Sequence, residues 1–183
     1  MRKDFGNQNW FFPEPVLIIG TYDEDGTPNA MNAAWGGVWD YDKIYISLSE
    51  HKTTKNLRLK KCFTLSFADT KHIVQADYVG IVSGNQVKDK IAKCGLETQK
   101  SNFVDAPIFT DFPLCLECVV DSFEDGNLIG KIVNTSADQS VLDENGKVDI
   151  SKLNLITYEP ITHKYVALGE VVGNAFSDGK KLK

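Results

Sequence analysis

The chain has 183 residues, of which 42% are hydrophobic and 25% are charged, and its 25 acidic and 20 basic side chains give a formal net charge of −5. This length and composition suit a globular protein with a core of its own, and they argue against intrinsic disorder, a membrane span and general nucleic-acid binding. The 4 cysteines are too few for a disulfide scaffold, so we expect one domain over residues 1–183 in a reducing, cytoplasmic setting, with no membrane and no nucleic-acid partner.

Strand signals recur along the whole chain. Apolar runs that are β-branched or alternate with polar residues, and that are bounded by turn residues, are typical of strands. Two hairpins are predicted, because acidic turns ending in Gly26 and Gly126 each join two such runs. Gly36 and Gly37 are expected to break the chain after the second strand. In chain order, the predicted strands cover residues 16–22, 28–35, 43–48, 62–68, 114–123, 128–133, 153–158 and 164–172.

Two short helices are predicted between these strands. Residues 53–61 begin with two threonines, either of which can cap a helix, and residues 86–94 lie between a capping Asn85 and a left-handed Gly95. Strands and helices do not alternate regularly. The pattern therefore predicts a mostly β protein, an antiparallel barrel with short flanking helices, and not a doubly wound parallel sheet.

Residues 29–37 form the most unusual of the predicted strand segments. They are poor in β-branched side chains and rich in alanine and glycine, so a flat ligand could lie close to the backbone amides. Asn29 and Asn32 add the donors and acceptors that read a heteroaromatic edge. The alternative is a crowded strand crossing, where small residues only relieve packing.

A second candidate site lies where the strand over 43–48 gives way to the helix over 53–61. Lys52 and Lys55 stand at the start of this helix, where acidic residues are usually favoured, and an external phosphate would complete such a site. Lys90, after a Ser-Gly-Asn turn, could add a further anion contact. A solvated basic surface explains these lysines equally well.

In order and spacing, several short motifs resemble the flavin reductase-like family, and most closely its flavoredoxin members. The resemblance extends from about residue 10 to residue 177. The motifs that carry it are Pro15-Val16, Asp25-Gly26, Pro28-Asn29-Ala30-Met31, Ala34-Trp35, Lys52-Thr53, Asn56, Gly80-Ile81-Val82-Ser83-Gly84, Asp89-Lys90, Tyr165, Leu168-Gly169 and Ala175-Phe176.

The resemblance implies a split β-barrel that binds FMN non-covalently and forms a homodimer, with the flavin at or near the subunit interface. It implies two groups of site residues. Along the isoalloxazine ring would lie Asn29, Ala30, Met31, Asn32 and Trp35, and around the phosphate Ser49, Lys52, Thr53 and Thr54, with Lys90 as a further anion contact. Asn32 stands where relatives often have Thr or Ser. Lys52 stands where many relatives have Arg. A lysine cannot bind a phosphate in the bidentate way of an arginine, so the phosphate would be held more loosely.

The function implied is that of a flavoprotein oxidoreductase, in which the flavin takes a hydride from NADH or NADPH, or electrons from a protein donor. This chemistry requires no protein acid or base, so no catalytic residue is predicted. No Gly-x-Gly-x-x-Gly run is present, and a nicotinamide would therefore stack only transiently on an exposed flavin face. Two alternatives stay open: a non-enzymatic electron carrier that docks with redox proteins, and a flavin-free barrel that acts as a binding module.

Other chemistry-bearing residues are interpreted as structural. Cys115 and Cys118 lie three apart in a predicted strand, so they point to opposite faces and form no predicted metal site. The 3 histidines show no triad context. The aromatic run over residues 10–12 is expected to plug one end of the barrel, with a dimer contact or a cover over the flavin as the alternatives.

Overall fold

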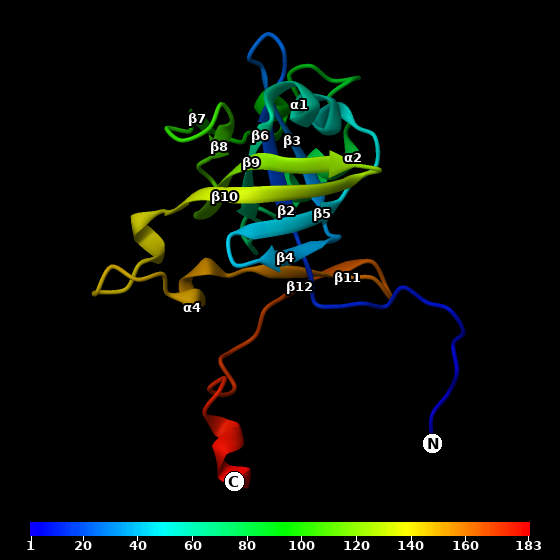
Figure 1. Ribbon diagram of the computed structural model, residues 1–183, viewed down its shortest axis with the longest axis vertical. Coiled ribbons are helices and arrows are strands. Elements are labelled where there is room, and N and C mark those ends of the chain that lie inside the picture. The colour runs from blue at the N-terminus through cyan, green and yellow to red at the C-terminus, as the bar shows by residue number, and fades with distance from the viewer.

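A seven-stranded antiparallel sheet, curled into a half-barrel, forms the body of the molecule in the computed structural model, which describes residues 1–183 (Figure 1). The predicted mostly β, antiparallel architecture is thereby confirmed. In spatial order the strands are β3 (Pro28–Ala33), β2 (Leu17–Tyr22), β6 (Cys62–Phe67), β9 (Leu114–Glu124), β10 (Asn127–Ala137), β5 (Lys43–Ser47) and β4 (Gly36–Asp40).

Two smaller sheets complete the strands. β1 (Glu14–Pro15), β11 (Ile156–Glu159) and β12 (Lys164–Ala167) form a three-stranded sheet below the half-barrel in Figure 1. β7 (Thr98–Lys100) and β8 (Pro107–Phe109) pair separately.

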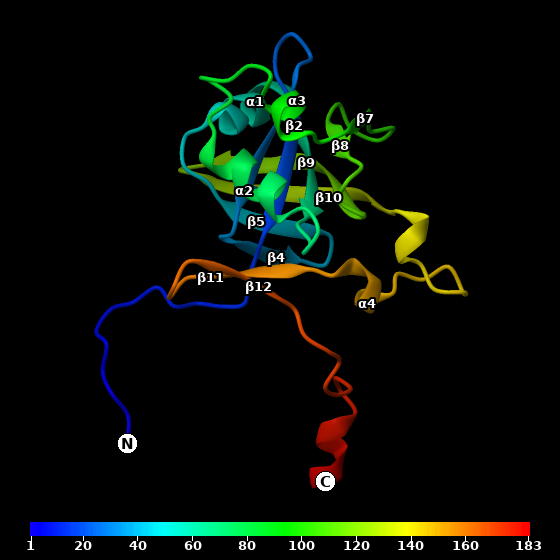
Figure 2. The ribbon, with the colours of Figure 1, turned by 180° about the vertical axis from the view of Figure 1, so that it is seen from behind.

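Short helices flank the sheet. α1 (Lys52–Lys60) crosses the top of the half-barrel, and Figure 2 shows α2 (Ile73–Ile81) and α3 (Lys90–Cys94) in front of the sheet when the molecule is seen from behind. The remaining helical segments are α4 (Ile150–Leu153), η1 (Gln139–Val141) and η2 (Asp178–Leu182). No helix has the length and apolar character that a membrane crossing requires.

The core lies on both faces of β2, which explains the unbroken apolar run that predicted this strand. Ile18 and Ile19 point to opposite faces and are both 0% exposed. Ile19 packs inside the half-barrel with Phe63, whereas Ile18 packs with Val79 of α2 in a second cluster outside the sheet. The outer cluster fixes α2 against β3, and this contact forms one wall of the candidate site.

Several predicted elements differ from the structure. The strand predicted over 153–158 begins at Ile156, the strand predicted over 128–133 extends to Ala137, and the helix predicted with a threonine cap begins at Lys52 after His51. β4 forms where two glycines were expected to break the chain, because a side chain at Gly36 would lie 2.8 Å from the carbonyl oxygen of Tyr45 and only glycine allows this pairing. α2 was not predicted, since its apolar sequence carries no clear capping signal. α3 begins four residues later than predicted, at Lys90, and the strand predicted over 164–172 ends at Ala167.

Both chain ends leave the body beside the three-stranded sheet and extend into solvent (Figures 1 and 2). We name residues 1–13 the N-terminal arm and residues 168–183 the C-terminal arm; every residue in both is exposed. The interpretation of residues 10–12 as a barrel plug is therefore wrong, because they lie in the N-terminal arm.

Candidate functional site

A cavity of about 330 Å³ opens where the end of β3 faces α2 and the β11–β12 hairpin. We call it the ring cavity. It brings together Met31, Asn32, Trp35 and Ser49 of the predicted site. The lining residues are Met31, Asn32, Ala33, Ala34, Trp35, Ser47, Leu48, Ser49, His51, Asp77, Gly80, Ile81, Tyr158 and Tyr165.

The two-residue period of β3 decides which side chains reach this cavity. Ala30 is fully buried in the outer core cluster, so only its backbone remains available to a ligand. Asn32 points toward α2, where its Nδ2 donates to the carbonyl of Ala76 at 3.0 Å. Gly80 permits this approach, because a Cβ there would lie 3.0 Å from the Cβ of Asn32. The small residues of this segment therefore allow close packing and also leave the backbone accessible, as the two interpretations above proposed.

The opposite wall of the ring cavity carries a hydrogen-bonded pair that the sequence did not identify as a pair. The hydroxyl of Tyr165 donates to Oδ1 of Asp77 at 2.8 Å. Burial, followed by the neighbouring Asp77 carboxylate, raises the pKa of Tyr165 to about 12, so the phenol remains a donor at neutral pH. Tyr158 lies beside Tyr165 with the ring centroids 6.4 Å apart. Tyr165 had been noted only as part of a motif, and nothing local in the sequence distinguished Asp77 or Tyr158.

A second cavity, of about 510 Å³ and lined only by non-hydrophobic residues, adjoins the start of α1. We call it the polar cavity. It brings together Asn29, Lys52 and Lys90 of the predicted site. Its remaining lining residues are Asp23, Glu24, Asp25, Thr27, Pro28, Gly84, Asn85 and Lys88.

Of the predicted phosphate residues, Lys52, Thr53 and Thr54 lie in the first turn of α1, but their side chains already have partners. Lys52 forms an ion pair with Asp23, with Nζ and Oδ2 3.0 Å apart. The buried Thr53 hydroxyl accepts a hydrogen bond from Nδ2 of Asn29 at 2.7 Å, and the Thr54 hydroxyl accepts one from the amide of His51 at 2.9 Å. The first amides of α1 have no acceptor within the helix, so the backbone is the free anion-binding group here.

Lys90 is placed differently from the exposed anion contact that was expected. It is 4% exposed, and its Nζ donates to the carbonyls of Val79 and Val82 at 3.0 and 2.7 Å. Val79 lies in the last turn of α2 and Val82 is its C-cap residue, so Lys90 caps that helix. Burial lowers the pKa of Lys90 to about 8. The sequence pattern could not distinguish a helix carbonyl from an external anion as the partner of this lysine.

The two cavities lie next to each other at the start of α1, where His51 lines the ring cavity and the adjacent Lys52 lines the polar cavity. Gly84 keeps the polar cavity open at this point, since a Cβ there would lie 2.4 Å from Oδ1 of Asn29 and 3.2 Å from Cγ of Lys52. An aromatic-walled cavity next to a helix N-terminus has the chemistry required by a flat heteroaromatic group with an anionic tail. The residues present therefore fit the group that the resemblance implies.

The cysteine pair of β9 takes no part in this site. Cys115 and Cys118 are both buried, and burial raises their thiol pKa values to about 11 and about 12. Thiols in this condition are protonated and unreactive at neutral pH. No group of three or more His, Cys, Asp or Glu side chains in the chain could hold a metal ion.

Comparisons with known proteins agree with this geometry. The family described as flavin reductase like domain matches residues 9–158. A comparison with curated protein sequences finds no match.

Three solved structures illustrate the similarity. The flavoredoxin of Desulfovibrio vulgaris (Miyazaki F) is 34% identical and has a TM-score of 0.93, covering 98% of this chain and 100% of its own. The flavoredoxin from Methanosarcina acetivorans is 24% identical, with a TM-score of 0.89 and 100% of both chains covered. An FMN-binding domain of a flavin reductases-like enzyme from Shewanella baltica OS155 is 19% identical, with a TM-score of 0.78, covering 88% of this chain and 89% of its own. The predicted split-barrel fold is confirmed.

Proposed function

This chain belongs to the flavin reductase-like family, and we propose that it is a flavoprotein oxidoreductase that holds FMN non-covalently and passes electrons through it. The observation that carries the proposal is that the ring cavity and the polar cavity lie next to each other at the start of α1. A ring with a phosphate-bearing tail needs both environments next to each other.

The residues that would hold FMN follow from this arrangement. The backbone from Asn29 to Asn32 and the indole of Trp35 would border the ring, together with Tyr158 and Tyr165. The first amides of α1 and the ammonium of Lys52 would bind the phosphate, which would then compete with Asp23 for that lysine. Ser49 lies between the two groups on the wall of the ring cavity.

The contribution of the protein to electron transfer would be positional and electrostatic. When bound, FMN would supply the capacity to accept a hydride and pass electrons on. β3 is an edge strand that pairs only with β2, so its outward amides and carbonyls have no strand partner and can bond to the edge of a ring. Amides aimed at the ring would stabilise negative charge that develops there. No side chain is required as an acid or base.

The donor assigned in this proposal is NADH or NADPH, which would stack on the solvent-facing side of the ring cavity. The second candidate is an electron carrier that receives electrons by docking with a redox protein. It is favoured by Trp35, which borders the ring cavity yet is 58% exposed, and by the net charge of −5, which would attract a basic partner.

Absorbance spectroscopy tests the proposal and separates the two candidates. Purified protein reconstituted with FMN should show a bound flavin spectrum, and FMN should raise the melting temperature because it binds only the folded chain. Anaerobic addition of NADH or NADPH should then bleach the flavin. Bound flavin that neither nucleotide bleaches would reject the reductase and support the carrier. A chain that neither binds FMN nor gains thermal stability from it would reject both.

We also propose that the protein acts as a homodimer. Trp35 belongs to the ring cavity and to an exposed apolar face, so a second copy on that face would lie next to the flavin. The contact that would join the two copies is argued below.

A further inference from the structure

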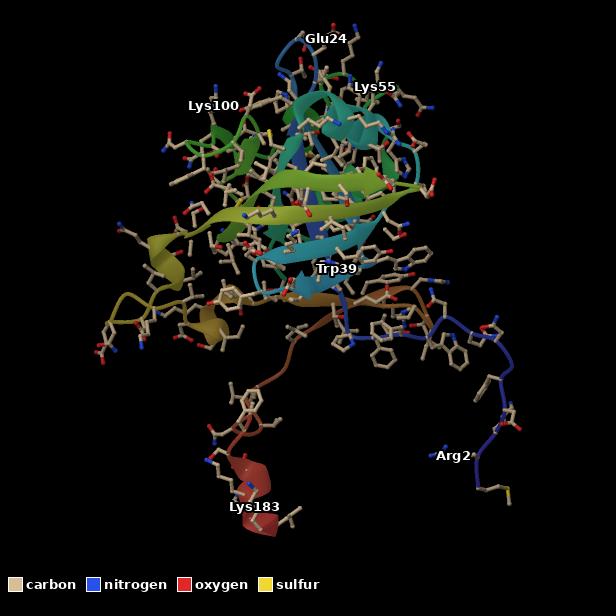
Figure 3. All side chains as sticks on the ribbon, in the orientation of Figure 1. Arg2, Glu24, Trp39, Lys55, Lys100 and Lys183 are labelled. Carbon is tan, nitrogen blue, oxygen red and sulfur yellow. The ribbon has the colours of Figure 1, made fainter.

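The C-terminal arm has no contact that explains its sequence. The last backbone hydrogen bond between this arm and the body runs from the amide of Leu168 to the carbonyl of Leu155, at 2.9 Å. Beyond it the hydrogen bonds are local, such as that from the amide of Asn174 to Oδ2 of Asp178 at 2.8 Å. Figure 3 shows Lys183 at the far end of the arm, well away from the sheets. The arm therefore extends from the body as a separate segment.

The composition of this arm is not that of a solvated tail. Val171, Val172, Phe176 and Leu182 are between 76% and 99% exposed. Tails that stay in solvent are poor in aromatic and β-branched residues. Clustered apolar side chains in such a position mark a surface that another molecule covers.

A matching apolar surface wraps around the edge strand β4 of the body, beside the roots of both arms. We name Trp35, Val38, Trp39 and Tyr41 the apolar belt; each is at least 58% exposed, and Figure 3 labels Trp39 within it. Val38 and Trp39 are neighbours in β4 and so point to opposite faces, yet both are exposed. β4 is also the edge strand of the seven-stranded sheet, with one side of its backbone unpaired. An apolar cavity of about 210 Å³ opens next to Val38 and Tyr41.

We propose that two copies of the chain exchange their C-terminal arms, each arm placing Val171, Val172 and Phe176 on the apolar belt of the other copy. A second copy is favoured over an unrelated partner because one chain carries both the arm and the belt. A two-fold symmetric dimer would contain two such arm–belt contacts, one in each direction.

Charge supports the same pairing. The arm ends in Lys180, Lys181 and Lys183, whereas the exposed Asp40 lies at the end of β4 beside the belt. Opposite charges at the rim of an apolar contact orient the two surfaces and exclude other partners. Since Trp35 also lines the ring cavity, arm exchange would cover the side of that cavity that a single copy leaves open.

Photochemical cross-linking tests the exchange directly. Phe176 is replaced by p-benzoylphenylalanine in the full chain, normal and heavy-nitrogen copies are mixed, and the sample is irradiated. We expect cross-links that join a normal arm to a heavy segment over residues 35–41, and the reverse. Cross-links confined to one copy, or to other segments, would overturn the proposal.

Oligomeric state provides the second measurement. The paired change Val172→Asp and Phe176→Asp should weaken the dimer by about tenfold or more in sedimentation velocity, as expected for central apolar contacts. Leu59→Asp, on the exposed face of α1, is the matched control and should leave the dimer unchanged. A monomeric wild-type chain, or variant arms that leave the dimer intact, would overturn the exchange. FMN absorbance is recorded on the same samples, so a failure to bind flavin would reject the proposed function without affecting this result.

Discussion

The hydroxyl of Tyr165 donates a 2.8 Å hydrogen bond to Oδ1 of Asp77 and thereby ties β12 to α2, across 88 positions of sequence. The bond joins the three-stranded sheet to the helix that covers β3. Because both side chains line the ring cavity, the width of that cavity depends on this contact. The raised pKa of Tyr165 keeps its hydroxyl protonated in neutral solution, so the bond persists there.

Removal of this bond should affect both stability and flavin affinity. Tyr165→Phe keeps the ring and removes one hydrogen bond to a charged group, so we expect a loss of about 1.5–3 kcal/mol of unfolding free energy and a higher FMN dissociation constant. Urea unfolding and FMN titration measure the two effects. Tyr158→Phe is the control, since its hydroxyl bonds to His163 in an exposed position and should contribute little. Equal effects of both changes would contradict this role of Tyr165.

Asp77 should lower the reduction potential of bound FMN. No Lys or Arg lines the ring cavity, so no basic side chain there offsets a carboxylate on its wall. The carboxylate therefore disfavours additional negative charge on a reduced ring. Asp77→Asn should favour the reduced over the oxidised flavin by about tenfold, which raises the potential of this two-electron couple by about 30 mV.

Equilibration with reference dyes measures this potential. Glu144→Gln, at an exposed position that lines neither cavity, is the matched control and should leave the potential unchanged. An unchanged potential in Asp77→Asn with normal FMN affinity would show that the ring does not lie near this wall.

The lysine at the start of α1 should control phosphate affinity. Lys52→Ala should raise the FMN dissociation constant by about tenfold or more, because a charge-assisted hydrogen bond contributes about 1.5–3 kcal/mol. Lys55→Ala is the control: Lys55 belongs to the same helix but is exposed at its outer surface (Figure 3). Asp23→Asn should act in the opposite direction to Lys52→Ala, since it releases Lys52 from its ion pair. Riboflavin, which lacks the phosphate, should bind all three variants as it binds the wild type.

The buried Lys90 should make part of the folding stability depend on pH. Its pKa is lowered from 10.5 to about 8 in the folded chain, so between those values the unfolded chain holds a proton that the folded chain has released. The contribution of Lys90 to stability therefore rises as the pH increases from about 8 to about 10.5. The buried thiols, whose pKa values are raised, act in the opposite sense.

The comparison with Lys90→Met isolates the lysine from the thiols. Urea unfolding measures the free energy of unfolding of both proteins. The value for the wild type should rise relative to that for Lys90→Met as the pH increases from about 8 to about 10.5. A constant difference would mean that Lys90 titrates normally in the folded protein.

The sequence predicted those parts of the fold that depend on local chemistry. The apolar run around Ile18 and Ile19 predicted a strand, and both hairpins form, with Gly26 and Gly126 at φ of 84° and 79°. The sequence did not predict β4, because a glycine usually weakens a strand and its benefit at Gly36 depends on Tyr45 of the neighbouring strand.

For the candidate site, too, the sequence predicted only what depends on local composition. The segments around Asn32 and Lys52 were identified because their composition departs from that of ordinary strands and helix starts. Asp77 was missed because its significance comes from Tyr165, which is distant in sequence. Lys90 was predicted as an anion contact because sequence gives its charge, but not the carbonyls at the end of α2 that it caps.

The unpaired outer side of β4 has a consequence for the handling of the protein. A bare strand edge is a template on which another chain can add a strand, and proteins usually protect such edges with charges, prolines or a covering segment. If the arm of a second copy covers this edge, a chain that lacks residues 168–183 loses that protection. We therefore expect such a truncated chain to precipitate first, and the full chain to keep longer in storage.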